Sequence, residues 1–346
     1  MQIFLEKNIK MIIKLSSGVV LAALLLSSQV FPVSARENSV FGIHLLHPAE
    51  LEKGLELIAP TETNEWHYVT IPLSLEDIHK DRSSEWQDFF RKAKEKKVIP
   101  IVRLVTTFDN GAWAIPTKGD IVDIFAFLGK LDWPSEKKYI IVFNEVNHAN
   151  EWGGNIDPEN YADLLRFTAN WAHSEEKNYQ ILPAAMDLGA SNGAETREAF
   201  EYLNAMLAYD PHLFEVLDYW NSHSYPNPGF SASPEKTDKK SLRGYTYELA
   251  YLKNKSNREL QTFITETGWE DNSTTHRWLS AYYQYAADQI WTDERIVAVT
   301  PFILQGAPGP FTRFSFVDQD GHPTAQYHAY QDTIKRAVEK HLAETH

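Results

Sequence analysis

Two glutamates stand in short polar segments that directly follow apolar runs. Glu145 lies in the segment FNEVNH at 143–148, and Glu266 lies in FITETGW at 263–269. A pair of carboxyl groups can cleave a glycosidic bond, because one protonates the leaving oxygen while the other attacks the sugar or activates water. The pair therefore predicts glycosidic-bond cleavage, provided that the fold brings both glutamates to one site.

The position of these glutamates matters more than the motifs themselves. An Asn-Glu dipeptide also occurs at 64–65 and 150–151, and the sequence at 61–63 imitates the second motif. The glutamates at 62 and 65 precede a predicted strand, however, whereas Glu145 and Glu266 end one. The alternative interpretation of each glutamate is a solvated loop carboxylate or a helix cap.

An alternation of apolar runs and helix-period stretches follows the whole chain. Such an alternation predicts an α/β fold. The predicted strands are 41–46, 66–73, 98–104, 139–143, 181–186, 217–220, 262–265 and 296–304. The predicted helices are 48–58, 85–96, 118–131, one capped by Asp157 with Pro158 at its first position, 194–208, 239–255, 273–291 and a last one opened by Pro323.

Eight strand-and-helix units in a single domain, residues 36–346, favour a (β/α)₈ TIM barrel. The rival is a doubly wound open sheet, which typically carries a Gly-rich turn after its first strand when it binds a nucleotide. Residues 41–48 contain no such turn. In a barrel the chemistry lies at the carboxyl ends of the strands, where both glutamates stand.

The first 35 residues have the pattern of a secretory signal peptide. Three lysines precede an apolar run at 15–26, and a small-residue ending, Val33-Ser34-Ala35, precedes Arg36. We therefore expect cleavage before Arg36 and a secreted or cell-envelope protein. The alternative is an uncleaved amino-terminal anchor, although a run of twelve residues is short for a membrane span of about 20.

Charge and cysteine content exclude several classes of function. The formal net charge is −14, which disfavours nucleic acid and acidic membranes as partners. The chain has no cysteine, so it has no disulfide, thiolate metal site or thiol nucleophile. We expect no integral membrane partner and a monomer.

The two motifs, supported by NSHSYP at 221–226, resemble those of the clan A glycoside hydrolases, the barrel group of the cellulases, mannanases and β-1,3-glucanases. The resemblance implies a retaining double displacement with Glu145 as general acid/base and Glu266 as nucleophile. It also implies that Asn144 bonds the sugar hydroxyl next to the reacting carbon. His223 and Tyr225 would then support the acid and the nucleophile respectively.

The resemblance does not extend to one family. FITETGW is similar to the nucleophile segment of the family 17 β-1,3-glucanases, but that motif continues with proline where this chain has Glu270. Many clan members place a tryptophan at the end of strand eight. Here Phe302 or Gln305 would take its place.

Further binding residues are predicted at the strand exits. Arg103, at the end of the third strand, could hold the nucleophile ionised, the alternative being a surface ion pair. Flat rings stack on sugar faces, so Trp113, Trp152, Trp269 and Phe311 in the exit loops could line a glycan groove. The alternative for each ring is loop packing.

Two other classes of function remain as alternatives. The segment GASNG at 189–193 matches the nucleophile elbow of serine hydrolases, with Ser191 as nucleophile and Asp318 with His322 or His328 as partners. A barrel that binds glycans without cleaving them is the other. Ser191 would be expected to react with a fluorophosphonate only in the first case.

We predict no resident metal and no cofactor, because the double displacement needs none. His44 and His47 lack an obvious third ligand, and a structural Ca²⁺ in the acidic loops is left open. The predicted partner is a neutral β-linked glycan, and the sequence leaves its sugar and linkage open. Endo and exo action, and hydrolysis and transglycosylation, are left open as well. Retention predicts carboxyl groups about 5 to 5.5 Å apart.

Overall fold

The computed structural model describes residues 38–61 and 64–345. These residues belong to one compact unit. The predicted signal peptide, with its apolar run and cleavage site, lies outside the described residues. Among the described residues, no helix has the length and apolarity needed to cross a membrane.

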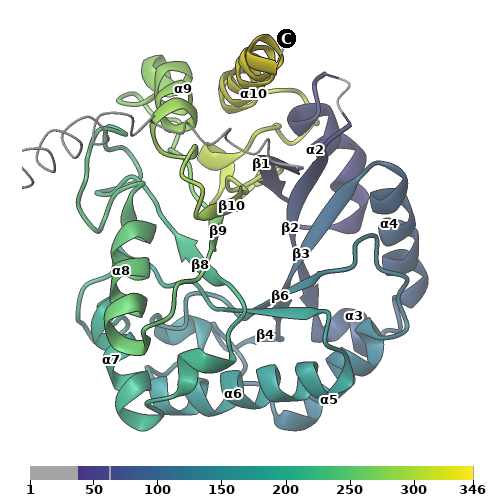
Figure 1. Cartoon of the computed structure of the whole chain (residues 1–346), viewed down its shortest axis with the longest axis vertical. Coiled ribbons are helices and arrows are strands. Elements are labelled where there is room, and N and C mark those ends of the chain that lie inside the picture. Colours follow the sequence, from purple (N-terminus) through teal and green to yellow (C-terminus); the bar gives the residue numbers. More distant parts are fainter. Residues whose placement is uncertain (1–37, 62–63, 346) are drawn as a thin grey trace, which may run out of the picture. The chain divides into compact units, whose positions relative to one another are not determined.

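Eight parallel strands form the centre of the fold and helices surround them, as Figure 1 shows. The order of neighbouring strands is β7-β6-β3-β2-β1-β10-β9-β8. The two ends of this series meet, because Asp187 and His223 form a parallel bridge and Asn221 Nδ2 donates to the Pro183 carbonyl over 3.2 Å. The predicted (β/α)₈ barrel is confirmed. Its strands are β1 (Asn38–His44), β2 (Trp66–Ser74), β3 (Val98–Val105), β6 (Lys138–Val142), β7 (Tyr179–Pro183), β8 (Trp220–His223), β9 (Thr262–Glu266) and β10 (Ile296–Val299).

The helices that cover the barrel bury one face each against the strands. Their starts follow local chemistry: the Thr117 hydroxyl accepts from the Asp120 N–H, and the Asp157 carboxylate caps a helix that begins at Pro158. The helices are α2 (Leu51–Ile58), α3 (Leu75–His79), α4 (Ser83–Glu95), α5 (Lys118–Leu128), α6 (Pro158–Glu175), α7 (Ala199–Tyr209), α8 (Gly244–Ser256), α9 (Leu279–Gln289) and α10 (Ala325–Thr345). Short 3₁₀ turns are η1 (Pro48–Glu50), η2 (Ala149–Glu151), η3 (Leu213–Val216), η4 (His276–Trp278) and η5 (Thr312–Phe314).

The side-chain alternation of a strand decides which residues face the barrel interior. In β3, Ile99 and Ile101 belong to a buried apolar cluster with Tyr139 and Phe263 of other strands. Arg103 comes two residues after Ile101, so it lies on the same face but at the carboxyl end. The interior is therefore apolar below and charged at the mouth.

Several predicted element bounds differ from the structure. The strand predicted at 217–220 begins at Trp220, because residues 213–216 form η3 and the N–H of Asp218 bonds the Ile181 carbonyl at 3.0 Å. The strand predicted to 304 ends at Val299. The helices predicted from 194, 239 and 273 begin five or six residues later. These exit loops have helix-compatible composition but turn and bond to one another instead.

The loop after β3 contains a hairpin that was not predicted. Its strands are β4 (Phe108–Asp109) and β5 (Ala112–Trp113), joined through Asn110 and Gly111 with φ of +51° and +86°. An Asn-Gly pair between such residues is a strong hairpin signal, since both positions require positive φ. The signal was present in the sequence at 110–111.

Candidate active site

Glu145 leaves the end of β6 through a strained backbone. Phe143 has φ of +71° and Glu145 has φ of +30°, values that residues with a side chain rarely adopt. Such strain persists only where the surrounding structure holds it, which is typical of functional sites. It directs a half-buried carboxyl group, with a side chain 23% exposed, toward the barrel mouth.

Glu266 ends β9 and is buried among polar partners. Its Oε1 accepts a 2.5 Å hydrogen bond from Arg103 Nη1, and its Oε2 accepts from the Tyr225 hydroxyl at 3.1 Å. His44 Nδ1 lies 3.6 Å from Oε1. One oxygen is therefore oriented by a cation and the other by a phenol, which fixes the carboxylate plane.

His223, at the end of β8, lies between the two glutamates. Its Nδ1 is 2.8 Å from Glu145 Oε1 and 3.7 Å from Glu266 Oε2. One carboxylate oxygen of each glutamate and a ring nitrogen of His223 all lie within 4.8 Å of one another. The two carboxyl groups predicted from strands four and seven of the barrel thus share one site.

The charges of the site give its groups different protonation states. Burial alone would raise the pKa of Glu266, but the positive charges of His223 and Arg103 hold that pKa well below its usual range. Burial would lower the pKa of His223, and the carboxylates of Glu266 and Glu145 raise it instead. Burial and the Arg103 charge lower the pKa of His44 to about 3. Glu266 is thus an ionised carboxylate beside a neutral His44.

Asn144 connects this site to a third carboxyl group. Its Oδ1 accepts from Arg103 Nη1 at 2.9 Å, and its Nδ2 donates to Glu151 Oε2 at 3.3 Å. Burial and the nearby charge of Glu145 raise the pKa of Glu151 to about 7. Glu151, from the Asn-Glu dipeptide at 150–151, is a site residue that was not predicted.

The raised pKa of Glu151 predicts a pH dependence of stability. A folded-state pKa of about 7, above the ordinary value of 4.5, means that the folded protein holds the proton more tightly. The contribution of Glu151 to the free energy of unfolding is then fully present below about pH 4.5 and is lost as the pH rises toward 7. Glu151→Gln should remove this loss. The difference in the free energy of unfolding between the variant and the parent, measured with urea, should be about 2 kcal/mol more favourable to the variant at pH 8 than at pH 5. Glu136→Gln, on an exposed loop, is the matched control, and equal pH profiles of the Glu151 variant and the parent would contradict the expectation.

Helix α8 anchors the strand end that carries His223. The Ser222 hydroxyl donates to the buried carboxyl group of Glu248, and it also bonds the Ser224 hydroxyl at 2.8 Å. Ser224 Oγ in turn accepts from the N–H of Tyr245 at 2.9 Å. These bonds fix the exit of β8 on both sides of His223.

The predicted aromatic groove is wrong for two of its rings. Trp152 is 1% exposed and donates from Nε1 to Asn160 Oδ1, and Trp269 is fully buried and donates to the Ala232 carbonyl. Both are enclosed by the loops they stabilise, so neither presents a face to a sugar. Trp113 is half-buried in the hairpin, beside Phe108.

The end of β10 carries the other predicted aromatic residues. Phe302 packs edge-on against His44 at 5.3 Å and against Phe311 at 5.0 Å, and Phe311 is 45% exposed. Gln305 instead makes its polar contact with the Asp318 carbonyl, at 3.5 Å. Of the two residues predicted to replace the clan's tryptophan, Phe302 is the one that adjoins His44.

The serine-hydrolase alternative lacks its geometry. Asp318 and His322 contact one another at 3.4 Å, and Ser191 uses its carbonyl to accept from the Thr196 hydroxyl. Across residues 38–61 and 64–345, no hydrogen bond joins Ser191 to His322 or His328. The segment at 189–193 is a polar loop.

Two groups of described residues have the spacing of metal ligands. One is Glu145, His223 and Glu266, whose ligand atoms are already engaged by hydrogen bonds and by Arg103. The other is the half-buried Asp318 with the exposed Asp320 and His322. The two carboxyl groups and the imidazole of the first group are suited to proton transfer.

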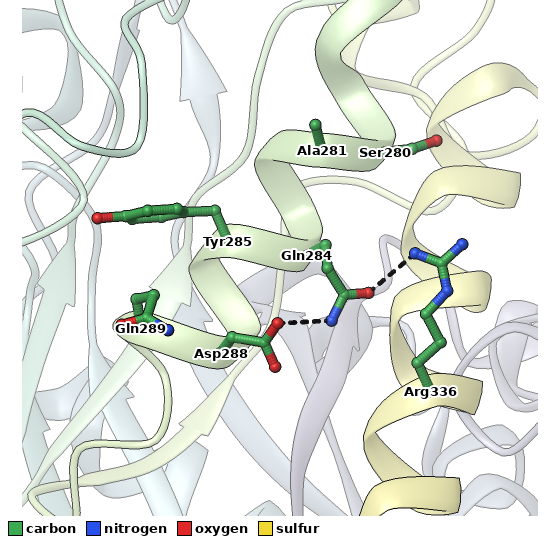
Figure 2. A pocket seen from close by; sticks show the side chains of 7 residues that line it. All are labelled: Ser280, Ala281, Gln284, Tyr285, Asp288, Gln289 and Arg336. Carbon is green, nitrogen blue, oxygen red and sulfur yellow. Dashed lines mark hydrogen bonds between the residues drawn. The ribbon is translucent and has the colours of Figure 1, made fainter.

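A hollow of about 560 Å³ lies away from the strand ends, between the outer helices α9 and α10. Figure 2 shows Gln284 donating to Asp288 over 2.9 Å and accepting from Arg336 over 3.1 Å, while Tyr285 points away from α10. Gln284, Asp288 and Arg336, three of the polar side chains that line this hollow, thus bond one another. It therefore offers no chemistry comparable to the paired glutamates.

No protein-family model and no curated protein matches this chain. Solved structures do match. A β-xylosidase from Caulobacter crescentus CB15 superposes with a TM-score of 0.60 at 14% identity, over 85% of this chain and 68% of that one. The chain has the barrel fold of glycoside hydrolases.

Two shorter glycoside hydrolases match over almost their whole length. An endo-β-1,4-glucanase from Xanthomonas axonopodis pv. citri, carrying three substitutions, superposes at a TM-score of 0.59 and 14% identity, over 86% of this chain and 99% of that one. A family 128 endo-β-1,3-glucanase from Pseudomonas viridiflava has a TM-score of 0.51 at 17% identity, over 85% and 97%. The predicted resemblance to the clan is confirmed at the level of the fold. Activity has to be argued from the site, since one fold hosts many functions.

Proposed function

We propose that this protein is a retaining glycoside hydrolase that cleaves β-glycosidic bonds of a neutral glycan. One observation carries the proposal. One carboxylate oxygen of Glu145 and one of Glu266 lie within 4.8 Å of one another at the carboxyl ends of two barrel strands. Retaining enzymes keep their carboxyl groups about 5 to 5.5 Å apart, whereas inverting enzymes need about 6.5 to 9.5 Å for a water molecule.

The environments of the two carboxyl groups support different roles. Glu266 is held ionised by Arg103 and His223, so its carboxylate is the nucleophile that attacks the anomeric carbon. The leaving oxygen takes a proton from Glu145, whose Oε1 is bonded to His223 and whose Oε2 is left for the substrate. A covalent glycosyl ester on Glu266 results.

The second half of the reaction uses the same groups in reverse. Glu145, now a carboxylate, takes a proton from a water molecule, and that water attacks the anomeric carbon and displaces Glu266. The configuration at the sugar is retained after two inversions. Tyr225 donates to Glu266 Oε2 and stabilises the carboxylate as it leaves. Asn144, held by Arg103, is placed to bond the neighbouring sugar hydroxyl.

The cellular setting is proposed from the sequence. The leader at 1–35 supports export, with residues 36–346 as the mature single-domain enzyme, and no lipid-anchoring cysteine is present. These features fit a monomer of net negative charge that acts on a neutral polysaccharide outside the cell.

Release of reducing ends from a panel of β-1,4-glucan, mannan, xylan and β-1,3-glucan tests the proposal. The mature protein should act on at least one glycan, with the β configuration of the released sugar followed by NMR in the first minutes. Glu266→Gln and Glu145→Gln, prepared identically, should each lose orders of magnitude of this activity. A folded protein that binds a glycan but releases no ends would support the non-catalytic barrel instead.

Arg103 offers a test through the pH profile. Glu266 must be ionised to attack, so activity is lost as the pH falls through its pKa. Arg103→Met removes the adjacent positive charge, raises this pKa and should move the acid limb of kcat/KM upward by about 1 to 3 pH units. Arg103→Lys keeps the charge and should restore the limb in part. An acid limb at the same pH in Arg103→Met would contradict this role.

A further inference from the structure

A second hollow, of about 450 Å³, lies on the same face of the barrel as the paired glutamates. It is formed by two exit loops, the one after β6 and the one after β7. Loops that leave the carboxyl ends of neighbouring strands adjoin at the catalytic face of a barrel. The lining residues are Gly154, Asn155, Ile156, Asn192, Gly193, Ala194, Thr196, Arg197 and Glu201.

Backbone bonds fix this hollow relative to the segment that carries Glu145. The His148 N–H donates to the Glu145 carbonyl at 2.8 Å, and His148 forms an antiparallel bridge with Thr196. Asn147 bonds both backbone groups of Arg197, the residue after Thr196. The Asn147 carbonyl accepts from the Arg197 N–H, and Asn147 Nδ2 donates to the Arg197 carbonyl, each at 2.9 Å. The backbone of Arg197 is therefore as fixed as the catalytic segment.

The guanidinium of Arg197, in contrast, forms no hydrogen bond and no ion pair with a described residue, although its charge interacts with the buried Tyr202. Its side chain is half-buried in the hollow. Each of the other ten arginines of the described part of the chain has a hydrogen bond, an ion pair or an aromatic ring: Arg82, Arg91, Arg103, Arg166, Arg243, Arg258, Arg277, Arg295, Arg313 and Arg336. The N–H donors of the Arg197 guanidinium are therefore available to a ligand in the hollow.

The same hollow carries groups of the opposite polarity. Glu201 Oε2 accepts from Asn192 Nδ2 at 2.9 Å, and Glu201 forms no ion pair with Arg197. The hollow is thus lined by the guanidinium donors of Arg197, the carboxylate acceptor of Glu201 and the side-chain amides of two asparagines. Ile156 supplies an apolar wall. Opposite charges in one pocket suit a neutral ligand with many hydroxyls more than an anion.

We propose that this hollow is a distal sugar subsite, which binds a neutral pyranose ring of the same glycan chain that is cleaved between Glu145 and Glu266. Neighbouring ring hydroxyls accept from the Arg197 guanidinium and donate to Glu201, and the C–H face of the ring packs on Ile156. This inference rests on the proposed function and deepens it, because it makes the substrate an oligosaccharide or polysaccharide that reaches beyond the cleaved bond.

The distal subsite predicts a dependence on chain length. On the neutral β-glycan that the parent enzyme cleaves, kcat/KM should rise from the disaccharide to the hexasaccharide. In Arg197→Met the hexasaccharide should lose about 10-fold more of its kcat/KM than the disaccharide, because a charge-assisted hydrogen bond to the outer ring is lost. Arg197→Lys should recover part of the loss, and Arg91→Met, on the outer surface of α4, should show the parent's profile. An equal loss at every length, or no loss at any, overturns the subsite.

Calorimetric binding separates this inference from the proposed function. The hexasaccharides of β-1,4-glucan, mannan, xylan and β-1,3-glucan are each titrated into Glu266→Gln and into the double variant that also carries Arg197→Met. Weaker binding by the double variant supports the subsite even if the parent cleaves no glycan, in which case only the proposed hydrolysis fails. Equal binding overturns the subsite. Stronger Arg197-dependent binding of a uronic-acid oligosaccharide than of its neutral counterpart overturns the neutral ligand and assigns the hollow to an acidic group.

Discussion

Glu266→Ala should abolish hydrolysis, and azide should restore turnover of an activated aryl glycoside with an α-glycosyl azide as product. The nucleophile acts as a unit with its base and its orienting groups, so its loss should cost at least about 10⁴-fold in kcat. The alanine leaves a space beside the Arg103 guanidinium and the Tyr225 hydroxyl, two donors that formerly bonded the carboxylate. A small anion fits that space and attacks the same face of the sugar once, which inverts its configuration.

The design distinguishes loss of the nucleophile from loss of the fold. Removing Glu266 leaves a buried Arg103 without its carboxylate, so the stability of Glu266→Ala must be measured by thermal unfolding alongside Glu266→Gln, which keeps the volume. NMR of the azide product gives its configuration. A β-glycosyl azide, or rescue by azide of Arg103→Met but not of Glu266→Ala, would assign the nucleophile elsewhere.

The order of strands and helices was predictable from the sequence because it follows from burial. Runs such as 98–102 are apolar on both faces, as strands between a packed barrel interior and a helical layer must be. Polar strand ends defeat the same reasoning. β8 consists of Trp220 and the polar residues up to His223, so the preceding apolar residues were taken for the strand. Helices α5 and α6 begin at local capping residues, whereas α7, α8 and α9 begin after exit loops whose bonds to distant segments no local pattern encodes.

The core of the site was also predictable, since a barrel brings every strand end to one place. Glu145, Glu266, Arg103, His223 and Tyr225 meet as the strand exits require. Site residues that do not stand directly at a strand end were not predicted. Glu151 reaches Asn144 only because η2 folds back at the mouth. Trp152 and Trp269 follow strands as sugar-binding rings would, and only packing reveals that they are enclosed.

Glu145→Gln should impair glycan cleavage by about 10² to 10⁴-fold while sparing substrates with good leaving groups. A dinitrophenyl leaving group departs without a proton, so the covalent intermediate on Glu266 should still form, whereas a sugar leaving group requires the acid. Glutamine keeps the size of the side chain and can still bond His223, so the loss reports proton transfer and not a collapsed site.

The second step gives this prediction its sharpest readout. Without a carboxylate at 145, water attacks the intermediate slowly, and the dinitrophenyl glycoside should give a burst followed by a slow steady state. Azide needs no general base, so it should speed the steady state and yield a β-glycosyl azide, the opposite anomer from that of Glu266→Ala. Glu136→Gln, on the exposed loop before β6, is the matched control. Equal losses of Glu145→Gln on both kinds of leaving group would remove the acid role, since only a proton donor to the leaving oxygen makes the rate depend on which group departs.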